Sequence, residues 1–224
     1  MSASGIAFET RSLRGLRYGV RLGGDARAPA VLLLHGFAGS GAEWTAVLAA
    51  LVAAGFRAIA VDLPGHGATV APEGLPLSRF AMEETALDLV ALLDDLSIPR
   101  AHWVGYSMGG RIALGTALAH PERVDTLTLE SAAPGIADAV ERAERVRSDE
   151  TLATTIESRG AEWFAESWGS LPIFESQRSL PEAMRAELAR RRAECDPAGL
   201  ALSLRAVRCL PGLLMLLVFS TQPA

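Results

Sequence analysis

The stretch Gly105-Tyr106-Ser107-Met108-Gly109-Gly110 decides the fold, because it matches the pattern Gly-x-Ser-x-Gly and lies between a strand-like and a helix-like segment. The preceding residues 101–104 are short and apolar enough for a buried strand. The following residues 111–120 are rich in alanine and leucine, as a helix is. Ser107 is therefore predicted to occupy a sharp strand-to-helix turn, a nucleophile elbow, whose flanking glycines let backbone segments approach closely.

Composition limits what kind of protein this is. The chain has 224 residues, half of them hydrophobic, and is long enough to bury a core. Its net charge of −5 argues against nucleic-acid binding, since no basic stripe could neutralise phosphates. The two cysteines, Cys195 and Cys209, indicate neither a disulfide framework nor a metal site. Without a secretory signal or a long apolar run, we expect a cytoplasmic protein with no membrane partner and no metal.

Alternating strand and helix patterns predict the α/β class. Residues 6–22 are typical of a hairpin of two short strands. The continuous apolar runs 30–34 and 57–61 are typical of parallel strands that are covered on both faces, and residues 124–129 form a further strand pattern. Amphipathic helix patterns separate these strands. This order predicts a mostly parallel sheet with helices on both faces.

The pattern changes at Pro134. Residues 138–196 are rich in arginine and glutamate and carry no strand pattern. They predict four or five short helices, including 139–147, 152–159, 161–168 and 181–194. We expect an α/β core of residues 1–133 and an inserted helical cap of residues 134–205. Such a cap would lie over the C-terminal ends of the parallel strands, where open sheets bind ligands.

Ser107 is the candidate nucleophile or proton relay. In an elbow, one donor to a developing oxyanion is the backbone N–H of the next residue, here Met108. The second donor comes from the loop after an earlier strand, here at Phe37. The alternative is that Ser107 only caps the following helix.

The sequence offers no obvious base for this serine. A serine of ordinary acidity needs a base and an orienting carboxylate, and both are expected after residue 107. The only later histidine, His120, ends the elbow helix about three turns away and cannot be the base. His35 and His66 are interpreted as groups that structure loops, and His102 as a side chain packed in the sheet.

Several motifs resemble the α/β-hydrolase family. They are His35-Gly36-Phe37-Ala38-Gly39-Ser40-Gly41, Asp62-Leu63-Pro64-Gly65-His66-Gly67, the elbow with Arg111, and Glu130-Ser131 with Pro134-Gly135. The segments 144–149, 164–168 and 172–174 are more narrowly similar to the 2-succinyl-6-hydroxy-2,4-cyclohexadiene-1-carboxylate (SHCHC) synthases of menaquinone or phylloquinone biosynthesis. The similarity runs from about residue 28 to Arg205. The motifs shared with the wider α/β-hydrolase family indicate the fold. The segments 144–149, 164–168 and 172–174, which lie in the expected cap, indicate the substrate.

The resemblance implies a carbon-oxygen lyase with no cofactor. It would expel pyruvate from 2-succinyl-5-enolpyruvyl-6-hydroxy-3-cyclohexene-1-carboxylate by removing a ring proton α to the succinyl carbonyl, with Ser107 as the proton-abstracting group. The implied residues for binding this small polycarboxylate are Tyr106, Arg111, Arg145, Trp168 and Arg192. Arginine suits such a substrate, because a guanidinium binds carboxylates bidentately and stays charged.

Two other hypotheses stay open. The first is another α/β-hydrolase activity, ester or carbon-carbon bond hydrolysis, with Ser107 attacking covalently. The second is a non-catalytic relative that keeps the elbow without its base. The arginine-rich cap favours the lyase, since esterase pockets are mostly apolar. The sequence does not indicate an oligomeric state.

The resemblance ends after Arg205. The family continues to a strand with the triad aspartate and a loop with the triad histidine, whereas residues 206–224 match nothing in that pattern. We expect residues 206–224 to be an aberrant tail, produced by a frameshift or a wrong gene model. The sheet would then lack its C-terminal strands, and the chain would be catalytically inactive or nearly so.

Overall fold

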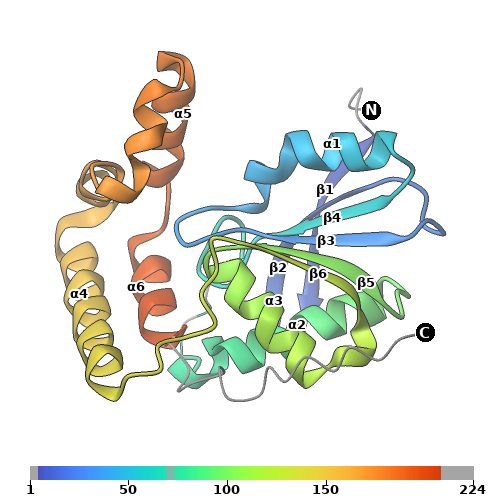
Figure 1. Cartoon of the computed structure of the whole chain (residues 1–224), viewed down its shortest axis with the longest axis horizontal. Helices are drawn as coiled ribbons and strands as arrows, with labels where there is room; N and C mark the ends of the chain where they lie inside the picture. Colours follow the sequence, from blue (N-terminus) through green and yellow to red (C-terminus); the bar gives the residue numbers. More distant parts are fainter. Residues whose placement is uncertain (1–4, 70–71, 73, 208–224) are drawn as a thin grey trace.

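A six-stranded sheet runs through the described part of the molecule (Figure 1). The computed structural model describes residues 5–69, 72 and 74–207. The strands are β1 (Ile6–Leu13), β2 (Leu16–Gly23), β3 (Ala30–Leu34), β4 (Arg57–Val61), β5 (Ala101–Tyr106) and β6 (Val124–Glu130). Their order is β1-β2-β4-β3-β5-β6, with β1, β2 and β4 paired antiparallel and the other pairs parallel. The predicted fold class is confirmed.

Helices cover both faces of the sheet, as Figure 1 shows. Helix α1 (Thr45–Ala53) lies on one face, and α2 (Met82–Asp95) and α3 (Met108–Ala119) lie on the other. Short 3-10 turns occupy Gly41–Trp44, Leu77–Phe80 and Pro121–Arg123. Val31 packs with the α1 cluster and Leu32 with the opposite cluster, since successive side chains of a strand point to opposite faces. Every residue of β3 and β4 is buried, which explains their continuous apolar sequences.

One buried carboxylate, that of Asp62, fixes the loops at the C-terminal edge of the sheet. It accepts hydrogen bonds from Nη1 of Arg21 at 2.9 Å, from the backbone N–H of Gly41 at 2.7 Å and from that of Ala68 at 2.9 Å. A buried charge is tolerated only when it is paired and hydrogen-bonded in this way. Asp62 thereby holds the loop after β4 against β2 and the loop after β3.

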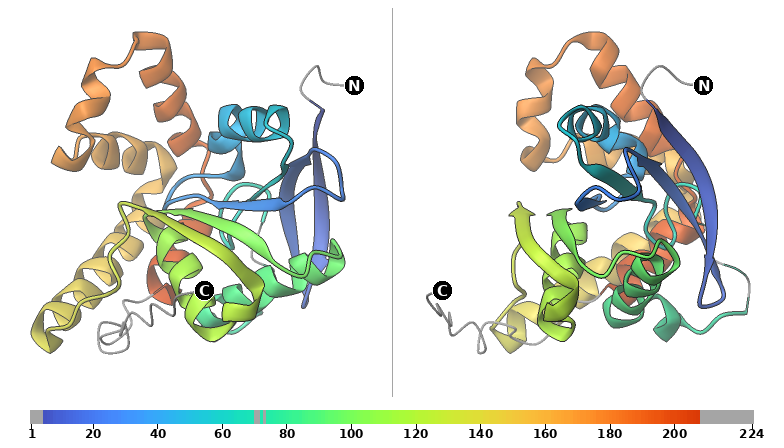
Figure 2. Two further views of the ribbon diagram at one scale, coloured as in Figure 1. Left: turned by 45° about the vertical axis from the view of Figure 1, so that its right-hand side comes forward. Right: turned by 90° about the vertical axis from the view of Figure 1, so that its right-hand side faces the viewer.

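The remaining helices form a layer beyond the C-terminal ends of the parallel strands (Figures 1 and 2). They are α4 (Ala139–Gly169), the 3-10 helix η4 (Pro172–Ser179), α5 (Glu182–Ala193) and α6 (Pro197–Ala206). This layer has its own apolar cluster, which includes Ile156, Phe164 and Leu200 and reaches Ala38 in the loop after β3. No described helix combines the length and the apolar character needed to cross a membrane. The core and cap boundaries drawn from the sequence stay a prediction.

The prediction of separate helices at 139–147 and 152–159 is wrong, because α4 runs through both ranges. The predicted separation of 152–159 from 161–168 is confirmed, because α4 consists of two helical segments that meet at Gly160. Residues 148–151 contain neither glycine nor proline, and the hydroxyl of Thr151 donates to the carbonyl of Arg147, so nothing there ends the helix. The predicted break at Gly160 is present as a kink with φ 81° and ψ 178°.

Helix α6 and the residue after it extend the fold beyond the predicted end. Asp196 caps α6 by accepting from the N–H groups of Ala198 and Gly199, and proline follows as the first helical residue. Ala206 ends the helix, and Val207 is 8% exposed and packs into the main core. These two residues belong to the fold and not to the aberrant tail. Residues 208–224 lie outside the described residues.

Helix α3 meets the ends of β3 and β5 without room for side chains. A Cβ at Gly109 would lie 2.5 Å from the carbonyl oxygens of Leu34 and His35. A Cβ at Gly105 would lie 2.5 Å from the Cα of Gly110. Contacts this short cannot be relieved by moving a flexible side chain, because the atoms belong to the backbone. The close approach predicted for the elbow glycines is confirmed.

We expect Gly109→Ala to lower the free energy of unfolding by about 1 to 3 kcal/mol or more, because α3 must shift away from β3. Gly115→Ala is the matched control on the same helix, since a Cβ there meets nothing within 4 Å. It should be neutral or stabilising by up to about 1 kcal/mol, because alanine favours helix. Urea unfolding followed by circular dichroism measures both. Equal midpoints for the two variants would contradict the packing account.

Candidate active site

Ser107 has a strained backbone at the turn between β5 and α3. Its φ of 51° and ψ of −111° are rare for a residue other than glycine. The neighbours hold it there: its N–H donates to the carbonyl of Glu130 in β6, and its own carbonyl accepts from the N–H of Arg111. Strain of this kind gathers at functional sites. The hydroxyl makes no capping hydrogen bond, so the alternative of a simple helix cap is wrong.

Two residues that the sequence assigns to an oxyanion hole, Phe37 and Met108, line the pocket that contains Ser107. Phe37 is in the loop after β3, and Met108 is the first residue of α3; both line a pocket with Ser107. Neither N–H takes part in the turn and loop hydrogen bonds of the described residues. The N-terminus of a helix also favours negative charge. This arrangement suits an oxyanion hole, and that role for Phe37 and Met108 stays a prediction.

Two adjoining pockets open at Ser107. The first pocket has a volume of about 280 Å³ and the second about 910 Å³. Both are lined by Phe37, Ser107, Ser131, Trp168 and Ile173. The serine therefore lies where the two pockets meet, and a ligand longer than either pocket could extend into both.

The first pocket carries charge from both layers of the molecule. Arg111 lines it from α3 of the core, and Arg145 lines it from α4. Nε of Arg145 donates to both carboxylate oxygens of Asp149, at 2.7 and 2.8 Å. Two of the arginines expected from the sequence are thus brought to the same pocket as Ser107.

The second pocket contains Tyr106 and Arg192. The guanidinium of Arg192 lies 4.7 Å from the ring centre of Phe174, and its Nη2 donates to Oε1 of Gln177 at 2.9 Å. Loss of hydration lowers the pKa of Arg192. A stacked and partly dehydrated guanidinium is well prepared to bind a carboxylate.

The neighbouring arginines differ from Arg192. Arg190 pairs with Glu187 and Glu194 on the exposed side of α5 and lines neither pocket. Arg191 lines the second pocket but is paired with Glu187. Among these three residues the structure therefore favours Arg192, as the sequence resemblance does.

Trp168 joins the two layers through aromatic contacts. Its ring centre lies 5.2 Å from that of Phe37 in the core, 5.4 Å from that of Phe164 and 6.0 Å from that of Phe174. Contacts of this kind fix the orientation of a ring. Trp168 is held as a shared wall of both pockets, and its contact with substrate stays a prediction.

Comparison with known proteins is decisive for the family. Residues 29–198 match the family model described as alpha/beta hydrolase fold. The chain belongs to the alpha/beta-hydrolase fold family. A Bacillus subtilis protein described as a candidate 2-succinyl-6-hydroxy-2,4-cyclohexadiene-1-carboxylate synthase is 40% identical over 190 residues, which is 85% of this chain and 68% of the relative. The resemblance inferred from the motifs is confirmed.

Two further matches agree. The Escherichia coli O1:K1 protein named 2-succinyl-6-hydroxy-2,4-cyclohexadiene-1-carboxylate synthase is 34% identical over 185 residues, covering 82% of this chain and 69% of that relative. The solved structure of MenH from S. aureus superposes with a TM-score of 0.77 at 27% identity, covering 84% of this chain and 70% of that chain.

An alpha/beta-hydrolase uses a histidine as the base for its elbow serine. His35 is engaged elsewhere: its Nδ1 donates to the carbonyl of Gly36 at 2.7 Å, and its Nε2 accepts from the N–H of Leu63 at 2.9 Å. Nδ1 of His66 donates to the carbonyl of Pro64 at 3.1 Å. Burial lowers the pKa of His35 to about 4 and that of His66 to about 3. Both are neutral groups that structure their loops, as interpreted from the sequence.

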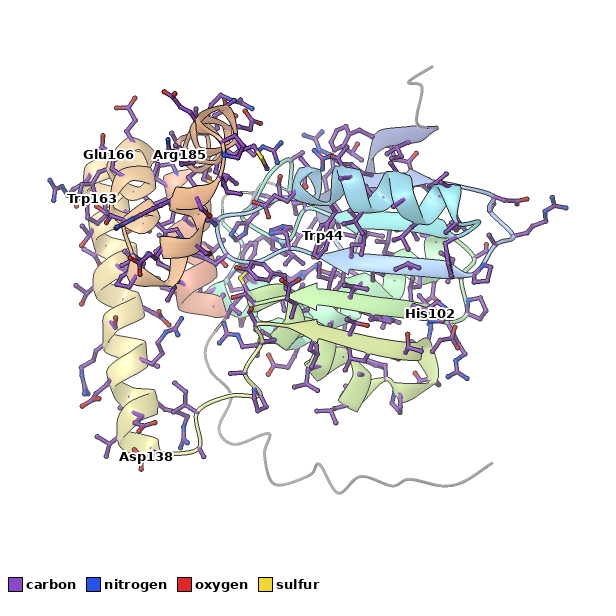
Figure 3. All side chains as sticks on the ribbon, turned by 45° about the horizontal axis from the view of Figure 1, so that its top comes forward. Trp44, His102, Asp138, Trp163, Glu166 and Arg185 are labelled. Atoms are coloured by element: carbon purple, nitrogen blue, oxygen red, sulfur yellow. The ribbon has the colours of Figure 1, made fainter. Side chains whose placement is uncertain are left out.

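The other two histidines of this alpha/beta-hydrolase are remote. His102 follows the first residue of β5 and bonds to Thr126, at the end of the sheet away from the helical layer (Figure 3). His120 caps the far end of α3, a helix of 12 residues, so about 18 Å separates it from Ser107. None of the four histidines of the sequence bonds to Ser107.

The pocket residues that the sequence did not single out include Asp149 and Gln177. Asp149 follows Arg145 by four positions on one helix, and this spacing is a recognisable signal of a side-chain pair. Gln177 has no such signal, because it meets Arg192 only through the folding of η4 against α5.

Stability should fall as the pH decreases from about 6.5 to about 4. The folded-state pKa of His35, about 4, lies below its ordinary value of 6.5, so the unfolded chain binds this proton first. The stabilisation is complete above pH 6.5 and decreases by about 3 kcal/mol on reaching pH 4.

The variant His35→Gln tests this, because an amide can also donate to Gly36 and accept from Leu63 without titrating. Its free energy of unfolding, measured in urea between pH 7.5 and 4, should change less with pH than that of the original chain. Parallel curves would show that His35 does not cause the loss.

Proposed function

We propose that this chain is an SHCHC synthase, a lyase that eliminates pyruvate from 2-succinyl-5-enolpyruvyl-6-hydroxy-3-cyclohexene-1-carboxylate. The observation that carries the proposal is the placement of Arg111, Arg145 and Arg192 around two joined pockets that meet at the elbow serine. Two relatives that bear the name of this activity, at 40% and 34% identity, support it.

The substrate's chemistry fits the distribution of charge. It carries carboxylates at separate points of its skeleton, and guanidinium groups are provided in both pockets by the core and by the helical layer. Each charge-assisted hydrogen bond of this kind contributes about 1.5 to 3 kcal/mol. The small molecule would lie across Ser107, with Trp168 forming a wall on both sides.

The substrate and product names define the electron flow. The C–H bond α to the succinyl carbonyl breaks, and its electron pair forms a ring double bond. The 3-ene shifts, and the C–O bond to the enolpyruvyl group breaks, which gives the 2,4-diene and pyruvate after protonation of the released enolate. Ser107 Oγ would receive the proton, and the N–H groups of Phe37 and Met108 would stabilise the negative charge on the succinyl oxygen.

A neutral serine hydroxyl can accept this proton only if its own hydroxyl proton leaves to a base. Among the residues that the structure describes, no hydrogen bond joins a histidine or a carboxylate to the Ser107 hydroxyl. This isolation favours the second candidate function, a relative that binds SHCHC-like polycarboxylates with little turnover. Ester hydrolysis is favoured less, because arginines line both pockets.

Binding tests the proposal without needing a base. We expect the chain to bind SHCHC in calorimetry, and Arg111→Ala or Arg145→Ala to weaken binding by about 10- to 150-fold through loss of a charge-assisted hydrogen bond. Arg100→Ala is the control, since Arg100 pairs with Asp125 and lines neither pocket. Absence of SHCHC binding would refute the proposal. Unchanged affinity in both pocket variants would show that the arginines are only solvated surface.

Turnover is a separate prediction. Without a histidine bonded to Ser107, pyruvate release should be slower than in a relative with a complete triad by about 10⁶-fold. Ser107→Ala should then lower the residual rate by less than about tenfold, because triad members act as one unit. A lactate dehydrogenase-coupled assay measures pyruvate release by the original chain and by the Ser107→Ala variant. Rapid release that Ser107→Ala abolishes would mean that a base reaches this serine.

A further inference from the structure

Asp149 places a carboxylate in a pocket that otherwise suits anions. It lines the first pocket together with Ser107 and Arg111, and only 13% of its side chain is exposed. A negative charge at this place repels a polycarboxylate ligand. An acidic residue in such a pocket therefore requires a compensating role.

The contact with Arg145 suggests that role. Both carboxylate oxygens of Asp149 accept from the single Nε of Arg145, at 2.7 and 2.8 Å. The two Nη atoms of Arg145 make no hydrogen bond with any described residue. Asp149 therefore engages only the Nε edge of the guanidinium. The two Nη atoms remain available to bind a carboxylate bidentately.

Helix stabilisation does not explain the pair. Arg145 precedes Asp149 by one turn on α4, and the favourable order for such pairs on a helix has the acid first. The arginine side chain is 45% exposed, so its contribution to folding is small. A long and partly exposed arginine without a partner would instead populate many rotamers and lose entropy on binding.

We propose that Asp149 is a positioning residue that holds Arg145 by Nε and so directs its two Nη atoms at a substrate carboxylate in the first pocket. The inference rests on the proposed function, since the carboxylate belongs to SHCHC or its precursor. Asp149 itself does not touch the substrate in this arrangement. It acts through the orientation of Arg145.

The direction in which Asp149→Ala changes the affinity for SHCHC distinguishes a positioning role from a purely electrostatic one. Asp149→Ala removes a negative charge from the pocket, so electrostatics alone predicts tighter binding of SHCHC. Loss of positioning predicts weaker binding, by about 5- to 50-fold. Asp149→Asn keeps one acceptor for Nε and should lie between the original chain and the alanine variant.

A double-mutant cycle tests the route through Arg145. In the Arg145→Ala background, Asp149→Ala should no longer weaken binding, and removal of the unpaired carboxylate should leave affinity equal or higher. A role in folding of α4 would weaken binding in both backgrounds. Glu157→Ala is the matched control, because Glu157 is an acid on the same helix that bonds to Arg205 and lines neither pocket. It should leave affinity unchanged.

Calorimetry with SHCHC gives the deciding outcomes. Weaker binding by Asp149→Ala, absent in the Arg145→Ala background, supports the inference. Equal or tighter binding by Asp149→Ala, while the original chain binds SHCHC, overturns the inference and leaves the proposed function standing. If the original chain does not bind SHCHC, the proposed function fails and the positioning role fails with it.

Discussion

The structure depends on the contact of helix α3 with the ends of β3 and β5 at distances that only glycine permits. With Gly109 against the carbonyl oxygens of Leu34 and His35, α3 has one position along the sheet. That position gives Ser107 its strained backbone and sets the N–H of Met108 beside the loop that carries Phe37. The site is thus a consequence of backbone packing, and strain at the serine is sustained by a close-packed surrounding.

The core was predictable because its signals are local. Strands β3 and β4 were predicted at their observed bounds, since residues buried on both faces must be continuously apolar. The helical layer was less predictable. Helix α4 continues through residues 148–151, because no glycine or proline ends it there and α4 packs against α6. Helix α6 was not predicted, although Asp196 and Pro197 form a recognisable helix-start pattern. Its apolar face is defined only by the cluster it joins.

The candidate site was predictable in its membership but not in its arrangement. Motifs indicated Ser107, Arg111, Arg145, Trp168 and Arg192. The division of these residues between two pockets depends on how α5 folds back over α4, which no periodicity encodes. The same holds for Gln177 and Phe174, which restrain Arg192 from a different helix.

Core and helical layer contribute to the site by different means, and this difference governs how each can change. The core provides main-chain donors at Phe37 and Met108, so their side chains can vary as long as the backbone stays in place. The helical layer provides side chains, including Arg145 and Arg192, and the identity of these side chains matters. The helices that carry them can shift slightly without strain at Ser107. Substitutions among these arginines should therefore alter which polyanion is bound, while the elbow and its oxyanion donors remain the same.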